Sequence, residues 1–174
     1  MLKFIINGVK TTDLKACFEF LKKRGNTPKE QQLIFEFLKF GIPSGDLHVC
    51  FKALAIRGNN PIDSKVILEL LEAGITISQL SLCFEAIGVR GDNQVDPWLI
   101  FEFLKAGVAP ENLKICYEAL AVRGDNEDDP KVIFELLKLG VVPNSLRVCF
   151  EGLAVRKDNP KDPKLVVQFV KAGV

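Results

Sequence analysis

Residues that carry chemistry are scarce in this sequence, and His48 is its only histidine. A nucleophilic triad needs a histidine beside its serine or cysteine, and no such partner accompanies His48 in a recognisable motif. A glycine-rich phosphate-binding loop and a C-x-x-C metal-binding motif are also missing. We therefore predict that the chain is not an enzyme and has no catalytic, cofactor-binding or metal-binding residues.

Long apolar runs and an excess of charge of either sign are missing too. No apolar stretch approaches the roughly eighteen residues that a membrane-spanning helix needs. The net charge of +1 favours neither nucleic acid nor an anionic membrane as a partner. The start, MLKFIINGVK, is too short and too interrupted to be a secretory signal. These absences predict a soluble protein that does not contact membranes.

What the sequence does have is an internal repeat with a period of 33 residues. The five cysteines keep this period: Cys17, Cys50, Cys83, Cys116 and Cys149. Five arginines do the same: Arg24, Arg57, Arg90, Arg123 and Arg156. Six glycines follow them: Gly8, Gly41, Gly74, Gly107, Gly140 and Gly173. We call residues spaced by this period a repeat column. The columns predict one domain, 1–174, with a partial helix at 1–7 and units at 8–40, 41–73, 74–106, 107–139 and 140–172.

Each unit predicts two helices. The first carries the pattern L-x-x-C-F-x-x-L, which in residues 113–120 places apolar side chains at the i, i+3, i+4 and i+7 positions of one helical face. The second includes the run VIFELL at residues 132–137, which is apolar over much of its circumference. This second helix should therefore be buried on more than one side.

Polar residues predict the helix ends. Asp129-Pro130, which recurs as Asp96-Pro97 and Asp162-Pro163, predicts the start of the second helix with aspartate as its N-cap. Gly140 predicts a left-handed cap at its end, and Arg123-Gly124 predicts the end of the first helix. Both connections are short, so the helices should be antiparallel. Because one hairpin cannot bury its apolar faces alone, we predict an all-α fold, an α-solenoid of five stacked antiparallel helix-turn-helix repeats.

The junction of one unit reads LKLGVVP, residues 137–143. It resembles the junction of pentatricopeptide repeats, which are slightly longer and bind single-stranded RNA. The unit also resembles the DNA-reading repeats of TAL effectors, although their pair of loop glycines is missing. KVIFELLKLG, residues 131–140, looks like the second helix of ankyrin repeats, but the T-P-L-H-x-A signature is absent. The resemblance implies a helical repeat protein, and no reading code is carried over.

The cysteine column predicts a buried apolar seam. Neighbouring helices lie roughly 8–10 Å apart, whereas a disulfide needs Cα atoms within about 7 Å. Equivalent cysteines of successive units are therefore poorly placed for disulfides. We expect each thiol to act as a small buried apolar group, in the cytoplasm or another reducing intracellular compartment.

Exposed columns that vary between units predict a binding surface. On the first helix, one such column is Lys15, His48, Ser81, Lys114 and Arg147. On the second helix, Trp98 stands in a column that is otherwise polar or charged, and an exposed tryptophan is a typical binding hot spot. We therefore expect a binding scaffold for a protein or peptide, with these six residues as its candidate contacts.

A single-stranded nucleic acid is the alternative partner, with the arginine column as a phosphate-tracking edge. The competing interpretation is that each arginine stabilises its own helix end and pairs with nearby acids such as Asp63, Asp96 and Asp129. So much negative charge beside the arginines favours this second interpretation, and we expect nucleic acid to be the less suitable partner.

The terminal units lack the polar surfaces that usually close a solenoid. Phe150, Val155 and Val167 lie in the last unit, which keeps the repeat pattern to its end. The chain is therefore expected to be either a piece of a longer array, which we favour, or a protein that associates end to end with copies of itself.

Overall fold

The computed structural model describes residues 11–24, 27–58, 60–91, 95–124, 126, 128–155 and 162–173. Across those ranges the chain forms ten α-helices and no strand, which confirms the predicted all-α class. Its contacts divide the chain into two compact units, Met1–Leu80 and Ser81–Val174. Of the helices in the described ranges, none combines the length and the apolar composition that crossing a membrane would take.

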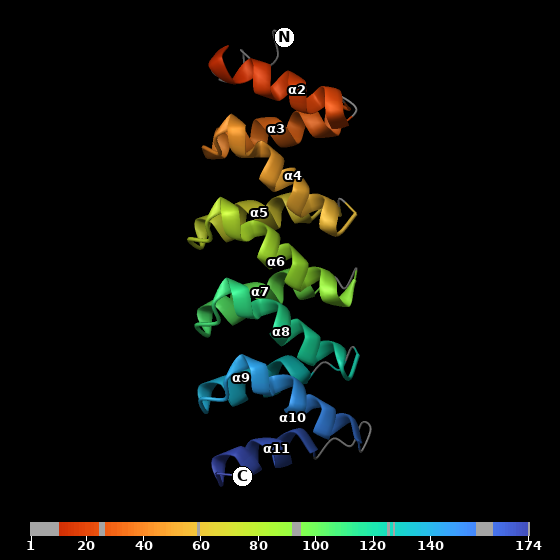
Figure 1. Ribbon diagram of the computed structural model, residues 1–174, viewed down its shortest axis with the longest axis vertical. Coiled ribbons are helices and arrows are strands. Elements are labelled where there is room, and N and C mark those ends of the chain that lie inside the picture. Colours follow the sequence, from red (N-terminus) through yellow and green to blue (C-terminus); the bar gives the residue numbers. More distant parts are fainter. Residues whose placement is uncertain are drawn as a thin grey trace. The chain divides into compact units, whose positions relative to one another are not determined.

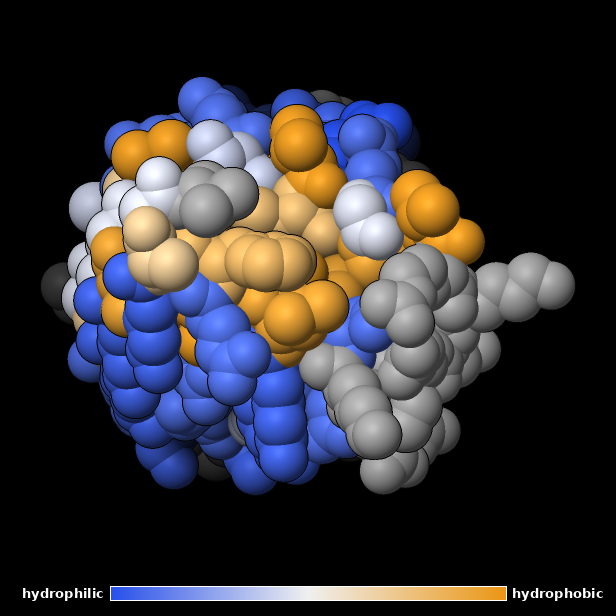
Figure 2. Space-filling model, turned by 90° about the horizontal axis from the view of Figure 1, so that it is seen from below, coloured by the Kyte–Doolittle hydropathy of each residue, from blue (hydrophilic) through white to orange (hydrophobic). Residues whose placement is uncertain are grey.

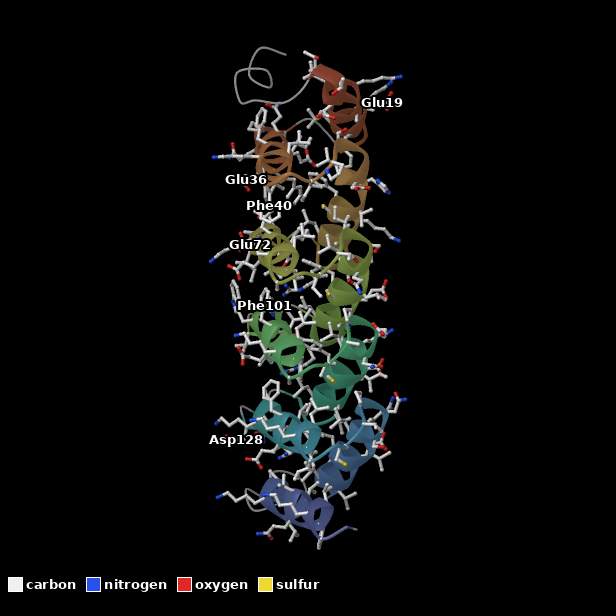
Figure 3. The ribbon with its side chains drawn as sticks, turned by 90° about the vertical axis from the view of Figure 1, so that its left-hand side faces the viewer. Glu19, Glu36, Phe40, Glu72, Phe101 and Asp128 are labelled. Atoms are coloured by element: carbon white, nitrogen blue, oxygen red, sulfur yellow. The ribbon has the colours of Figure 1, made fainter. Side chains whose placement is uncertain are left out.

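The first unit consists of two helical hairpins (Figure 1). Its α-helices are α2 (Leu14–Arg24), α3 (Pro28–Phe40), α4 (Leu47–Ile56) and α5 (Asp63–Glu72). Three short 3-10 helices accompany them: η1 (Thr11–Asp13), η2 (Ser44–Asp46) and η3 (Ile77–Gln79). Helix α2 packs against α3, α4 against α5, and α3 against α5. Glu36 of α3 and Glu72 of α5 lie on the side of this unit opposite Glu19 of α2, so first and second helices form two layers (Figure 3).

The second unit continues the same alternation. Its α-helices are α6 (Leu80–Ile87), α7 (Asp96–Lys105), α8 (Pro110–Ala121), α9 (Asp129–Lys138), α10 (Pro143–Val155) and α11 (Asp162–Lys171). The boundary between the two compact units falls after Leu80, so α6 belongs to the second unit from Ser81 on. The 3-10 helix η4 (Gly88–Arg90) follows α6 directly. Helix α8 packs along α10, and α9 packs along α11. First helices therefore contact first helices in one layer, and second helices contact second helices in the other.

The second helices begin at an aspartate. This aspartate is the first helical residue, whereas the sequence predicted it as the N-cap that precedes the helix. Helices α7 and α9 start with Asp96 and Asp129 as their first helical residues. The N-cap positions belong to Val95 and Asp128, neither of which makes a side-chain cap. The N-cap assignment was therefore wrong, because the carboxylates of Asp96 and Asp129 are engaged by arginine side chains described below.

Glycines end the second helices as predicted. Gly140 has φ +86° and follows α9, and its amide donates to the carbonyl oxygen of Leu137 at 3.0 Å. The next amide, of Val141, reaches back to the carbonyl of Leu136 at 3.0 Å. A side chain with a Cβ is strained at this positive φ, so the left-handed cap requires glycine. Gly124, with φ +74°, ends the first helix of that hairpin in the same way.

The core lies between the two layers of each unit and is built from the repeat columns. Cys17, Cys50, Cys83 and Cys116 are fully buried, as predicted, and Cys149 is half-buried. Tyr117 stands at the position that phenylalanine occupies in the other repeat units. Its hydroxyl donates to the carbonyl oxygen of Asp96 at 2.5 Å, so the one polar atom of this buried ring has a partner. Burial raises the pKa of Tyr117 well above its ordinary value.

Two alanine substitutions test the roles of the glycines. Gly140→Ala should lower the free energy of unfolding by about 1 kcal/mol, because it forces a left-handed backbone on a residue with a Cβ. Gly152→Ala, inside α10 with no atom within 4 Å of the added Cβ, should raise it by about 0.5 to 1 kcal/mol. Urea unfolding followed by circular dichroism measures both. Shifts of the same sign in the two variants would contradict the assignment.

Candidate functional site

Buried ion pairs join the two helices of three hairpins. The guanidinium Nη1 lies 2.5 Å from the carboxylate in Arg57–Asp63, 3.1 Å in Arg90–Asp96 and 2.6 Å in Arg123–Asp129. The arginine side chains are at most 9% exposed and the aspartates are 0% exposed. In each pair the arginine follows the end of a first helix and the aspartate begins the second helix. The predicted pairing with loop acids is confirmed for these three arginines.

The arginine column therefore serves the fold in every described pair. Arg90 also donates through Nη2 to the carbonyl oxygen of Gly124 at 3.2 Å, which links two successive hairpins of the second unit. The side chain of Arg24 and the whole of Arg156 lie outside the described residues. The phosphate edge stays a prediction, and three of its five arginines already hold a buried carboxylate.

The predicted first-helix column faces solvent along most of its length. Lys15, His48, Lys114 and Arg147 are exposed, and Ser81 is half-buried. Lys15 lies 3.9 Å from Glu19, and Arg147 lies 2.9 Å from Glu151. These exposed pairs contribute little to stability, so the side chains can rearrange around a partner. In the second unit, Lys114 of α8 and Arg147 of α10 stand on helices that pack side by side.

A second column, which is apolar and lies beside the predicted first-helix column, was not predicted from the sequence. Leu82 of α6 is 40% exposed and Val148 of α10 is 68% exposed, and each follows a residue of the predicted column. Ile115 of α8, between them in the repeat order, is half-buried. The sequence could have predicted this column, because its residue is apolar in every repeat unit: Ala16, Val49, Leu82, Ile115 and Val148. We refer to the two adjacent columns of the second unit as the first-helix surface.

Trp98 belongs to the other layer. It lies on α7, is 39% exposed, and stacks on Phe101 of the same helix with ring centroids 6.1 Å apart and an interplanar angle of 27°. Figure 3 shows Phe101 on the outer side of the second-helix layer of its unit. The structure therefore does not bring Trp98 together with Lys114 and Arg147, which lie on α8 and α10.

A groove of about 340 Å³ runs between α9 and α11. Its lining is Asp128, Lys131, Val132, Glu135, Pro163, Lys164 and Val167. Val167 stands in a column in which two other repeat units carry Phe101 and Phe134. A hydrogen bond from Lys131 and its charge lower the pKa of Asp128. The groove is lined by polar and apolar side chains, and its charged side chains are of both signs.

The cysteines are unsuited to nucleophilic chemistry. Burial raises the pKa of Cys50, Cys83 and Cys116 to about 12, so these thiols stay protonated near neutral pH. Burial also raises the pKa of Cys17 and of the half-buried Cys149. Within the described part of the chain, no three histidine, cysteine or carboxylate side chains come together as metal ligands.

Comparison with known proteins adds no family to this picture. No protein-family model matches the chain, and neither the curated proteins nor the solved structures show a significant match to it.

Removing one member of a buried ion pair should be costly. Arg123→Met should lower the free energy of unfolding by about 3 kcal/mol, because Asp129 would remain buried without its cation. Arg147→Met, the same change in a pair whose side chains are 59% and 53% exposed, should cost less than about 1 kcal/mol. The double variant Arg123→Met/Asp129→Leu should recover much of the loss. Equal losses in the two single variants, measured by chemical unfolding, would refute the structural role of the pair.

Thiol labelling should separate Cys149 from the other cysteines. At pH 8 and low protein concentration, a chromogenic disulfide reagent should react with one thiol well before the rest, since only Cys149 is partly exposed among the five. Cys149→Ser should remove the fast phase, and denaturant should make every remaining thiol reactive. A fast phase that persists in Cys149→Ser would show that one of the buried cysteines is accessible.

Proposed function

We propose that the chain is a non-enzymatic binding scaffold, an α-solenoid of five 33-residue hairpins that recognises a protein or peptide. Support for the repeat architecture comes from the glycine caps with positive φ at Gly41, Gly74, Gly107, Gly140 and Gly173. The helix-to-helix packing within each unit agrees with it as well.

The observation that carries the proposal is the division between constant and variable columns. Two columns that hardly change between repeat units are buried: the cysteines of the first four repeat units and the paired arginines 57, 90 and 123. The first-helix column, which changes in charge and size, is exposed along most of its length, as at Lys15, His48 and Lys114. A scaffold that keeps its interior uniform while its surface varies is suited to recognising an irregular partner such as a polypeptide.

The chemistry of the first-helix surface favours a peptide with apolar anchors. Val148 and Leu82 expose apolar area beside cations at Lys114 and Arg147. The carboxylates of Glu85 and Glu151 are exposed on the same helices, α6 and α10. Exposed apolar side chains surrounded by charges of both signs are typical of protein–protein contacts.

Single-stranded nucleic acid remains the second candidate, on the basis of the resemblance to pentatricopeptide and TAL-effector repeats and of the exposed Lys114 and Arg147. It has less support, because a phosphate-binding surface needs a concentration of cations. Arg57, Arg90 and Arg123 of the arginine column add no exposed cation to such a surface, because each is paired with a buried aspartate.

Selection from a phage-displayed random peptide library tests the proposal. Peptides selected on the purified chain should lose at least about tenfold in affinity for Val148→Lys, because a charge would replace an exposed apolar contact. Leu139→Lys is the matched control: Leu139 is also exposed, at 39%, but follows α9 in the other layer. Peptides that bind Val148→Lys normally and fail on Trp98→Ala would move the site to α7.

The same preparation should be titrated with fluorescent mixed-sequence single-stranded RNA and DNA at low and physiological salt. We expect no saturable binding. Salt-sensitive binding that is lost in Lys114→Glu/Arg147→Glu, together with no selected peptides, would replace the protein partner by nucleic acid. These two exposed cations are the appropriate positions to change, because substitutions at Arg57, Arg90 or Arg123 would destabilise the fold.

A further inference from the structure

A column of glutamates lies on the same helical face as the two columns of the first-helix surface. Its members are Glu85 of α6, Glu118 of α8 and Glu151 of α10. Each follows the predicted column by four residues and the apolar column by three, so it lies about one helical turn further along that face. Glu85 and Glu151 are exposed, and Glu118 is half-buried. We call these three residues the glutamate column.

The first helices of the second unit carry an excess of negative charge. Together, α6, α8 and α10 contain four glutamates and two cations: Glu85, Glu111, Glu118, Glu151, Lys114 and Arg147. Arg147 donates to the carboxylate of Glu151 at 2.9 Å and offsets its charge. The sequence of α6, LSLCFEAI, contains no lysine or arginine that could offset Glu85 within the helix. A partner that complements this layer brings positive charge.

Apolar side chains are exposed beside this negative charge. Leu82 is 40% exposed, Val148 is 68% exposed, and Ile115 is half-buried. Figure 2 views the end of the second unit formed by α10 and α11, where apolar side chains are exposed next to hydrophilic ones. Exposed apolar area with a polar surround is typical of a contact surface. Each first helix of this unit therefore offers one apolar and one acidic position to a partner.

The spacing of the helices selects the conformation of such a partner. Helix α8 packs along α10, and packed helices lie roughly 8–10 Å apart. A segment in the polyproline II conformation advances about 9 Å in each three-residue turn, so every third residue faces the same way and meets the next helix. An α-helix needs about seven residues for the same advance. Polyproline II also keeps its backbone groups in water, which suits a layer of helices whose own backbone groups are already paired.

We propose that the first-helix surface and the glutamate column bind an extended polypeptide segment made of repeated triplets. Each triplet has one lysine or arginine, one apolar residue and one residue that faces solvent. The cations pair with the glutamate column, and the apolar residues pack on Leu82, Ile115 and Val148. Three triplets, about nine residues, span α6, α8 and α10. This inference rests on the proposed function, a scaffold for a protein or peptide, and specifies the chemistry and conformation of the bound segment.

A fluorescent nine-residue peptide of three Arg-Leu-Pro triplets tests the arrangement by fluorescence anisotropy. It should bind at least about tenfold more tightly than a peptide of the same composition with its three arginines, three leucines and three prolines in separate blocks. A peptide of Glu-Leu-Pro triplets should not bind. Equal affinity of the triplet and block peptides would show that charge alone attracts them and would overturn the proposal. Tighter binding by a helical peptide with a leucine at every seventh position would overturn it as well.

Charge reversal in the chain locates the site. Glu85→Lys/Glu118→Lys should weaken binding of the Arg-Leu-Pro peptide by at least about tenfold, because two attractions become repulsions. Glu102→Lys/Glu135→Lys is the matched control: it changes the net charge equally, and both glutamates are exposed on α7 and α9 in the other layer. The control should bind like the unchanged chain. Equal losses in the two variants would reduce the effect to net charge and contradict the proposed site.

The peptides selected by phage display separate this inference from the proposed function. Selected sequences with a cation and an apolar residue at every third position would support both. Selected peptides that depend on Val148 but contain no cations would leave the binding scaffold standing and overturn the triplet partner. If neither selected peptides nor the Arg-Leu-Pro peptide bind, both proposals fail.

Discussion

The buried arginine–aspartate pair within a hairpin is the interaction on which the local architecture depends. It joins the end of a first helix to the start of the second across a loop rich in polar residues, as in Arg123 and Asp129. Bringing both charges out of water is costly, and their mutual attraction offsets that cost only when the two helices meet at the correct distance. The pair thus couples the geometry of the loop to the packing of the helices, and a misplaced hairpin would leave a buried charge without its partner.

The same pair explains why the arginine column does not form a cationic surface. An arginine that repeats at a constant interval looks like a phosphate-binding row when only the sequence is considered. In the described pairs, the guanidinium turns inward to the first residue of the second helix. Other cations remain exposed, among them Lys114 and Arg147 of the first-helix column. The constancy of the arginine column thus reflects a requirement of the fold, and the first-helix column, which varies, is the surface that we propose for recognition.

Aromatic joints connect successive hairpins within each compact unit. In the first, Phe51 of α4 packs edge to face against Phe37 of α3. In the second, Tyr117 of α8 packs in the same way against Phe103 of α7. Each joint takes one ring from a second helix and one from the following first helix, so the repeat of the sequence helps to set how neighbouring hairpins pack.

How far the candidate site could be predicted varied with the kind of signal. Exposure of Lys15, His48, Lys114 and Arg147 followed from helical periodicity, because their neighbours at the apolar positions point inward. The exposure of the apolar side chains of Leu82 and Val148 was not predicted. From the sequence, an apolar residue next to the core positions of a helix cannot be distinguished from a core residue, because its burial depends on the packing of neighbouring helices. Trp98 was correctly placed on the second helix. Its stacking on Phe101, one turn along the same helix, depends on side-chain orientation that periodicity does not supply.

The sequence by itself determined the all-α class of the fold and the glycine caps that end the second helices in the described ranges. These are local properties: apolar spacing selects a helix, and a residue without a Cβ permits the left-handed turn that ends it. Tertiary structure decided which carboxylate each arginine meets, which moved the predicted N-cap aspartates into the first position of their helices. It also decided which members of an apolar column remain exposed. Both depend on neighbouring hairpins, and burial is a property of the packed layers that no single repeat contains.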